Sequence, residues 1–173
     1  MKQNIKFWQI AGFFIVSALG VLLHFLFGWT ENAVIATFSS VNESTWEHMK
    51  LLFFPMVVFA IIENFIVGKD YQNFWCVKLK GILLGLLLIP TLFYTLGGIF
   101  GKTPDYINIA IFFVAVAIAF IYETKRFLKG SPCKYKKLAI IVLCLIAVAF
   151  MVFTFASPQI PFFQDSISQN YGI

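Results

Sequence analysis

The sequence contains little charge and few of the residues that build disulfide-bonded or flexible scaffolds. Charged residues occupy 12% of the 173 positions, and there are only 3 cysteines, 6 prolines and 11 glycines. These scarcities exclude a disordered chain, a collagen-like chain and a small disulfide framework. Apolar residues are abundant, at 60%, and 22 residues are phenylalanine. Because too few polar residues remain to cover a water-soluble globule, the composition indicates a membrane protein.

The sequence also lacks the short motifs of common enzyme classes. It has no phosphate-binding loop, dinucleotide-binding fingerprint, G-x-S-x-G turn or H-E-x-x-H helix. Its only histidines are His24 and His48, which excludes a three-histidine metal site. The net charge of +5 would suggest nucleic acid in a soluble chain. Here the basic residues lie between apolar runs, so membrane topology explains them and we expect no nucleic-acid partner.

Five apolar segments are long enough to cross a bilayer. A transmembrane helix needs about 20 mostly apolar residues, and the lipid interior offers the backbone no hydrogen-bond partner, which favours helices. The segments are residues 7–28, 50–67, 81–98, 106–122 and 138–157. We therefore predict an all-α membrane protein in which residues 1–173 form a single integral membrane domain, a bundle of five transmembrane helices in contact with the lipid bilayer.

Basic residues are divided unequally between the two sides of this bundle. With the N-terminus inside, eleven of the 13 lysines and arginines fall on the inner side, and the two others are Lys50 and Lys102. The positive-inside rule then predicts an inner N-terminus and an outer C-terminus. The basic loop 125–137 is a candidate surface for anionic lipid headgroups, although setting orientation is its simpler role. Cys76 and Cys133 fall on the same inner side, where thiols are expected to stay reduced.

Small residues at helical spacing predict close helix packing. Gly81 and Gly85 lie one turn apart in the third span, as Ala115 and Ala119 do in the fourth. We favour packing within the bundle, with a homo-oligomer as the alternative. The first span carries a small and polar stripe that should face protein, made of Ser17, Gly20, His24 and Gly28.

The most polar stretch opens the second span. Ser40 with Glu43 three residues later has the form of a capping box, which predicts a helix start here with Glu43 as a capping residue. Asn42 is an alternative N-cap. Glu43 and Glu47 are four residues apart and share a helix face. Pro55, inside the span, is expected to bend the helix or free a carbonyl group.

The first helix runs outward and the second enters from the outer side, so their histidines lie at similar depth. The candidates for a ligand or metal site at this outer rim are His24, Glu43, Glu47 and His48. Imidazoles with a carboxylate suit zinc or iron, and we predict His24, Glu47 and His48 as the metal ligands. The same groups could relay protons or bind a cation. The alternative is a capped helix, an interfacial Trp46 and carboxylates in water.

Secondary candidates surround this set or lie deeper, namely Asn42, Trp46, Glu63 and Tyr94. Tyr94 belongs to the outer half of the third span. Glu63 lies near the inner side, where an intramembrane carboxylate is costly and is a candidate site. Its alternative role is an ion pair with Lys78, Lys80 or Arg126.

The stretch from Val41 to Pro55 resembles an uncharacterised family of small multi-spanning membrane proteins from Gram-positive bacteria. The mark of that family is N-E-S-x-W-E-H-x-K-L at the start of the second helix, preceded by a histidine late in the first. Met49 stands where leucine is expected. The resemblance implies a multi-pass protein of the bacterial cytoplasmic membrane but carries no activity. Binding or transport of a small ligand or cation is our leading hypothesis, with an intramembrane metal-dependent hydrolase or an accessory membrane subunit as alternatives.

Overall fold

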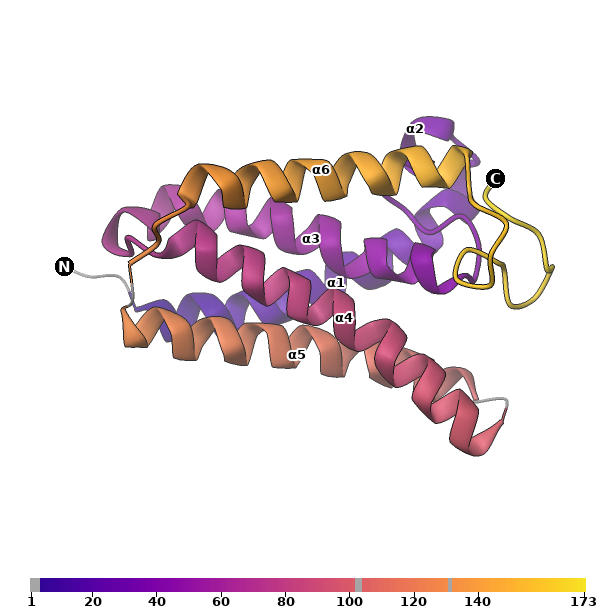
Figure 1. Ribbon diagram of the computed structural model, residues 1–173, viewed down its shortest axis with the longest axis horizontal. Helices are drawn as coiled ribbons and strands as arrows, with labels where there is room; N and C mark the ends of the chain where they lie inside the picture. The colour runs from indigo at the N-terminus through magenta and orange to yellow at the C-terminus, as the bar shows by residue number, and fades with distance from the viewer. Residues whose placement is uncertain (1–3, 102–103, 131) are drawn as a thin grey trace.

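The computed structural model describes residues 4–101, 104–130 and 132–173, which form helices joined by short connections (Figure 1). The long helices are α1 (Ile5–Thr30), α3 (Thr45–Ile66), α4 (Phe74–Phe100), α5 (Asp105–Lys129) and α6 (Lys136–Phe155). The short elements are α2 (Ala33–Ala36) and the 3-10 helix η1 (Gly68–Asp70). All five long helices are long and apolar enough to cross a membrane, which indicates a multi-pass membrane protein. Lys2 and Lys102, used in the charge count, lie outside the described residues.

Each predicted span overlaps one long helix, but α4 and α5 extend well beyond the predicted bounds. α4 begins at Phe74 rather than at residue 81, and α5 ends at Lys129 rather than at residue 122. The added turns contain Lys78 and Glu123, charges at which a hydropathy window stops. The helices continue through them because the backbone hydrogen bonds are unaffected and the two charges pair with each other.

The central helix of the bundle is α3. In its most apolar window 56% is buried, against 22–33% in the other long helices. It packs against α1, α4 and α6, while α5 packs against α1 and α4. The core side chains on α3 include Leu52, Phe53 and Phe59. Many apolar side chains of the outer helices are instead exposed, as expected of surfaces that face lipid, among them Phe7, Phe14, Leu87, Leu145 and Val148.

Pro55 and Gly20 together explain the close approach of α1 to α3. Proline has no N–H, so the carbonyl of Leu51 one turn earlier loses its usual helical donor. A Cβ added at Gly20 would lie 2.7 Å from that carbonyl oxygen, so only glycine lets the two backbones meet here. Ser17 of the same predicted stripe is buried. Gly28 is exposed, and a Cβ added there would have no atom from elsewhere in the protein within 4 Å. For this residue the prediction of a protein-facing stripe is wrong.

The helices define two ends of the bundle (Figure 1). We call the end where α1 stops and α3 starts the cluster end, and the end where α4 and α6 start and α5 stops the basic end. The chain after α6 returns over the start of α3, where the carbonyl of Phe162 accepts a hydrogen bond from the Trp46 backbone N–H at 3.2 Å. Where α4 ends and α5 begins, these two helices diverge from the rest of the bundle (Figure 1).

The start of α3 differs from the prediction. The N-cap is Ser44, whose hydroxyl accepts a hydrogen bond from the Glu47 backbone N–H at 3.3 Å. Ser40 and Asn42 precede the helix, and the Asn42 side chain accepts a hydrogen bond from the Ser44 N–H at 3.0 Å. The predicted Ser40–Glu43 capping box is therefore wrong, because Ser44 and Glu47 repeat the same spacing four residues later. Glu43 therefore does not cap the helix.

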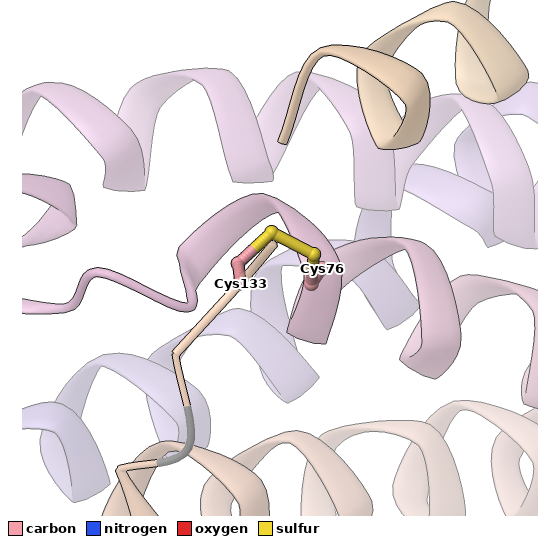
Figure 2. Close-up of a disulfide and its surroundings, with 2 residues drawn as sticks. All are labelled: Cys76 and Cys133. Atoms are coloured by element: carbon pink, nitrogen blue, oxygen red, sulfur yellow. A yellow bond between two sulfur atoms is a disulfide. The ribbon is translucent and has the colours of Figure 1, made fainter. Parts of the chain in front are cut away.

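The cysteines of the basic end also differ from the prediction. Cys76, in the first turn of α4, and Cys133, in the segment before α6, form a disulfide (Figure 2). The prediction of free thiols considered only the compartment. It missed that packing of α4 against α6 brings together two cysteines 57 residues apart in sequence.

Candidate metal centre

The segment between α2 and α3 is held in place by buried hydrogen bonds. The Ser39 hydroxyl donates to the Leu23 carbonyl and accepts from the Phe27 backbone N–H at 3.0 Å, which ties the segment to α1. The Lys50 ammonium reaches back from α3 and donates to the Ala36 carbonyl at 2.8 Å. Because both anchors are buried, the intervening chain has a defined path past the last turns of α1.

Glu47 belongs to this anchoring network. Its carboxylate lies 2.5 Å from the Lys50 ammonium, and the two side chains are only 2% and 0% exposed. The same carboxylate accepts the Val41 backbone N–H at 3.0 Å, and Thr154 of α6 donates to it. The structure therefore separates Glu47 from the two histidines with which it was predicted to bind a metal. Its acceptor oxygens are engaged by an ammonium, a hydroxyl and a backbone N–H.

Glu43 takes the place predicted for Glu47. Its two oxygens lie 3.7 Å from Nε2 of His24 and 3.1 Å from Nε2 of His48. The imidazole rings stack, with centroids 5.5 Å apart and an interplanar angle of 26°. One ligand atom from each of the three residues lies within 4.8 Å of the other two. The bundle thus brings His24 from α1, His48 from α3 and Glu43 from the preceding loop into one half-exposed cluster.

A hydrogen bond through Nδ1 fixes the orientation of the His48 ring. Nδ1 lies 3.0 Å from the Ser44 carbonyl oxygen, which can only accept, so Nδ1 carries a proton. Nε2 therefore faces a carboxylate oxygen of Glu43 at 3.1 Å, and either a shared proton or a metal ion can join these two atoms. The hydrogen bond to His48 lowers the pKa of Glu43, although its partial burial acts in the opposite direction.

His24 is less firmly held than His48. Its Nδ1 is buried and has no hydrogen-bond partner among the described residues. A metal-bound imidazole usually donates its second N–H to an outer acceptor, which fixes the ring and strengthens the ligand. His48 has this arrangement and His24 does not, so we rank His48 as the better-oriented ligand.

The secondary candidates at this end hold the surrounding chain. Asn42 donates from its side chain to the Gly172 carbonyl at 3.0 Å. Trp46 packs against phenylalanines of α6 and the tail, at centroid distances of 4.5–5.9 Å. The Tyr94 hydroxyl lies 3.4 Å from the Thr45 hydroxyl. None of the three enters the group of His24, Glu43 and His48, and their contacts instead fix the tail and α4 beside the start of α3.

Glu63 lies in a separate ionic group at the basic end. Lys78 of α4 lies 2.5 Å from Glu63 of α3 and 2.6 Å from Glu123 of α5. Gln9 of α1 donates to Glu63 at 2.7 Å. The side chains of the three charged residues are 0–1% exposed, and four phenylalanine rings surround the ammonium at 5.3–5.7 Å. Of the two roles considered for Glu63, the structure shows the ion pair with Lys78.

The comparison with protein families identifies the chain. A family model described as a family of unknown function, DUF6512, matches residues 1–173. The chain belongs to this family. No curated protein and no solved structure matched it. Membership in this family agrees with the resemblance found in the sequence to an uncharacterised family, and it supplies no activity.

Sequence reasoning missed the residues that position the site. Ser39 and Thr154 lie in stretches without any motif, and Lys50 was counted only as a charge on the outer side. A signal was present for Lys50 and Lys78, because a lysine inside an apolar helix needs a partner. For Lys50 that partner is Glu47, three residues earlier on the same helix, whereas for Lys78 the partners depend on which helices become neighbours.

Proposed function

We propose that this protein binds a divalent transition-metal ion, zinc by its ligand type, at His24, Glu43 and His48. The observation that carries the proposal is the position of Glu43 between the two imidazoles. In a tetrahedral zinc site, ligand atoms about 2.1 Å from the metal lie about 3.4 Å from one another. One oxygen of Glu43 lies 3.1 Å from His48 Nε2 and the other lies 3.7 Å from His24 Nε2, and one ligand atom from each of the three residues lies within 4.8 Å of the other two.

Exposure of the cluster supports exchange of the ion with the surroundings. The side chains are 29%, 32% and 38% exposed for His24, His48 and Glu43. Three protein ligands leave one position of a tetrahedral ion open to water or a ligand. A permanently closed structural site would instead use four protein ligands. The geometry therefore favours a site that loads and releases its ion, as binding or transport requires.

The hydrolase alternative has less support from the same geometry. A metal-dependent hydrolase needs a carboxylate near the metal that is free to act as a general base. Glu47 is the nearest further glutamate in sequence, and it is engaged by Lys50 and by the Val41 N–H. Asp165 of the tail also acts on the Glu43 carboxylate, but it accepts the Ile167 backbone N–H at 2.9 Å and the Ser168 hydroxyl at 2.6 Å, so neither further carboxylate is free to take a proton from a metal-bound water.

Isothermal titration of the purified, metal-stripped protein with zinc tests the proposal. We expect one ion per chain. Glu43→Gln and His48→Ala should each weaken binding by at least about 100-fold, since even changes to outer-shell partners of metal ligands cost 10–100-fold. Glu47→Gln is not expected to remove a ligand, and Glu31→Gln is the matched control, because Glu31 is an exposed carboxylate at the end of α1.

Two results would overturn the proposal. The first is an absence of zinc binding in folded wild-type protein, which would mean that a proton alone balances Glu43. The second is equal loss of binding in Glu43→Gln and Glu31→Gln, which would mean that zinc associates with exposed carboxylates in general. Circular dichroism of each variant establishes that the helices are intact.

A further inference from the structure

A cavity at the basic end combines positive charge with apolar side chains. It has a volume of about 390 Å³ and is lined by residues of α4, α5, α6 and the segment before α6. Three of its lining residues are cationic: Lys80 of α4, Arg126 of α5 and Lys134. No acidic residue lines it, and in the described ranges none of these three cations forms an ion pair. The cavity therefore presents uncompensated positive charge.

The cavity is also lined by apolar side chains of α4 and α6. Leu79 lies on α4, while Leu138 and Val142 lie one turn apart on α6. One turn of helix advances about 5.4 Å along the axis, so Val142 lies deeper in the bundle than Leu138. Leu138 is exposed to the outside of the bundle. An occupant of this cavity therefore meets both cationic and apolar side chains.

The cavity is held in shape by covalent and hydrogen bonds. The disulfide joins the segment before α6 to the first turn of α4, and both cysteines line the cavity (Figure 2). Asn73 also lines it and donates to the Arg126 carbonyl at 3.1 Å, which joins the start of α4 to the end of α5. The three cations thus come from separate segments that are fixed relative to one another.

We propose that this cavity binds the phosphate headgroup of an anionic phospholipid, with the upper part of an acyl chain against Leu79, Leu138 and Val142. The lipid headgroup and free inorganic phosphate both carry an anionic phosphoryl group, which Lys and Arg bind by charge-assisted hydrogen bonds. The apolar side chains favour the lipid, because inorganic phosphate has no hydrocarbon to bury. This site lies at the opposite end from the proposed metal centre and does not depend on it. The cavity contains Arg126 and Lys134 from the predicted lipid-binding surface 125–137, together with Lys80 from α4. Position 131 of that surface lies outside the described residues.

Native mass spectrometry with defined lipids tests the proposal. The delipidated protein in neutral detergent is titrated with phosphatidylglycerol and, separately, with phosphatidylcholine of the same chains. We expect one tightly bound phosphatidylglycerol and no comparable phosphatidylcholine adduct. The triple variant Lys80→Ala, Arg126→Ala, Lys134→Ala should lose about 100-fold in affinity, corresponding to about fivefold for each cation near an anionic lipid.

The matched control removes the same charge from the neighbouring surface. Lys125, Lys129 and Lys137 are exposed and do not line the cavity, and their triple alanine variant should change affinity by less than about threefold. Equal losses in the two triple variants would overturn the proposal in favour of diffuse attraction to the basic surface. Val142→Thr keeps the volume of the side chain and adds a hydroxyl, so it should weaken binding of phosphatidylglycerol but leave binding of inorganic phosphate unchanged.

Competition with inorganic phosphate distinguishes the two sources of the phosphoryl group. If the lipid is the occupant, millimolar phosphate should not displace phosphatidylglycerol from the wild-type protein. Displacement at equal concentrations, together with no effect of Val142→Thr, would show that the apolar side chains contribute nothing and would overturn the lipid assignment.

Discussion

The two ends of the bundle use the same kind of charge pairing for different purposes. At the basic end, Glu63 and Glu123 share the Lys78 ammonium, and the group is sealed at 0–1% exposure. At the cluster end, Glu43 faces two imidazoles that are 29% and 32% exposed. An ammonium sealed among phenylalanines cannot exchange with ions from solution. The partly exposed groups of the cluster end are open to the surroundings, which is why the proposed metal site lies there and not at the sealed group.

Glu47 and Glu43 lie one turn apart, yet their surroundings differ. Glu47 lies on the same helix as His48, one residue earlier, yet it joins a buried ion pair with Lys50. Its neighbour one turn before, Glu43, remains partly exposed. A carboxylate that is paired with an ammonium and buried serves structure, whereas one that is paired with imidazoles and open to water can serve binding. The following predictions test this contrast.

The prediction with the largest expected effect concerns the compartments that the two ends of the bundle face. The predicted orientation, N-terminus inside and C-terminus outside, places the proposed metal site outside and the basic end inside. Alkaline phosphatase fused after Ile173 should then be active, and a fluorophore that matures only in the cytoplasm should stay dark there. The opposite pair of results would reverse the orientation and would place the Cys76–Cys133 disulfide in the outer compartment, where disulfides persist.

Loss of Lys78 should have the largest effect on stability. Lys78→Met leaves two carboxylates buried without a counter-charge, and breaking a buried pair in this way costs about 3–5 kcal/mol. Unfolding in mixed micelles, followed by circular dichroism, measures the loss. Glu63→Gln or Glu123→Gln alone should cost less, because Lys78 retains one carboxylate partner.

The triple variant Lys78→Met, Glu63→Gln, Glu123→Gln is the control for the sealed group. It removes every charge and should recover much of the stability lost in Lys78→Met, since no ion is left unpaired. If the triple variant is no more stable than Lys78→Met, the loss reflects the packing of the lysine stem rather than its charge. Zinc binding should persist in every one of these variants that folds.

The coupling between His24 and His48 should be intermediate in size and should depend on zinc. With zinc at about 100 times its dissociation constant, binding to the native state stabilises it by about 2.7 kcal/mol. His24→Ala and His48→Ala should each remove most of this, and the double variant should lose little more. Denaturation of the four proteins with and without zinc measures the non-additivity. Additivity within about 0.5 kcal/mol in zinc would mean that the histidines act independently.

The smallest effect concerns the pH dependence contributed by Glu43 in metal-free protein. Its pKa is lowered below the ordinary value of 4.5, so the folded state favours the carboxylate. The resulting stability is fully present above that ordinary value and is lost as the pH falls through the lowered pKa. Because Glu43 is 38% exposed, we expect less than about 1 kcal/mol. The stability difference between wild type and Glu43→Gln should shrink on acidification, and a difference that grows would contradict the sign.

Hydropathy and residue spacing predicted much of the fold and less of the candidate site. The five spans were found because apolar runs of this length have few other uses, and the polar stretch before Leu51 marked where a site could lie. Of the four residues predicted at the outer rim, His24, Glu43 and His48 lie together in the structure. Glu47 is instead paired with Lys50, and Ser44 rather than Ser40 caps the helix.

The sequence by itself determined that this chain forms long apolar helices, because lipid-length runs of Phe, Leu, Ile and Val leave the backbone no alternative to internal hydrogen bonds. It also determined which residues are polar enough to need partners. Only the tertiary structure decided those partners. Ion pairs such as Glu63 with Lys78, and the meeting of His24 with Glu43 and His48, join segments from different helices and loops. Their geometry follows from helix packing at sites such as Gly20 against Leu51, which no local pattern encodes.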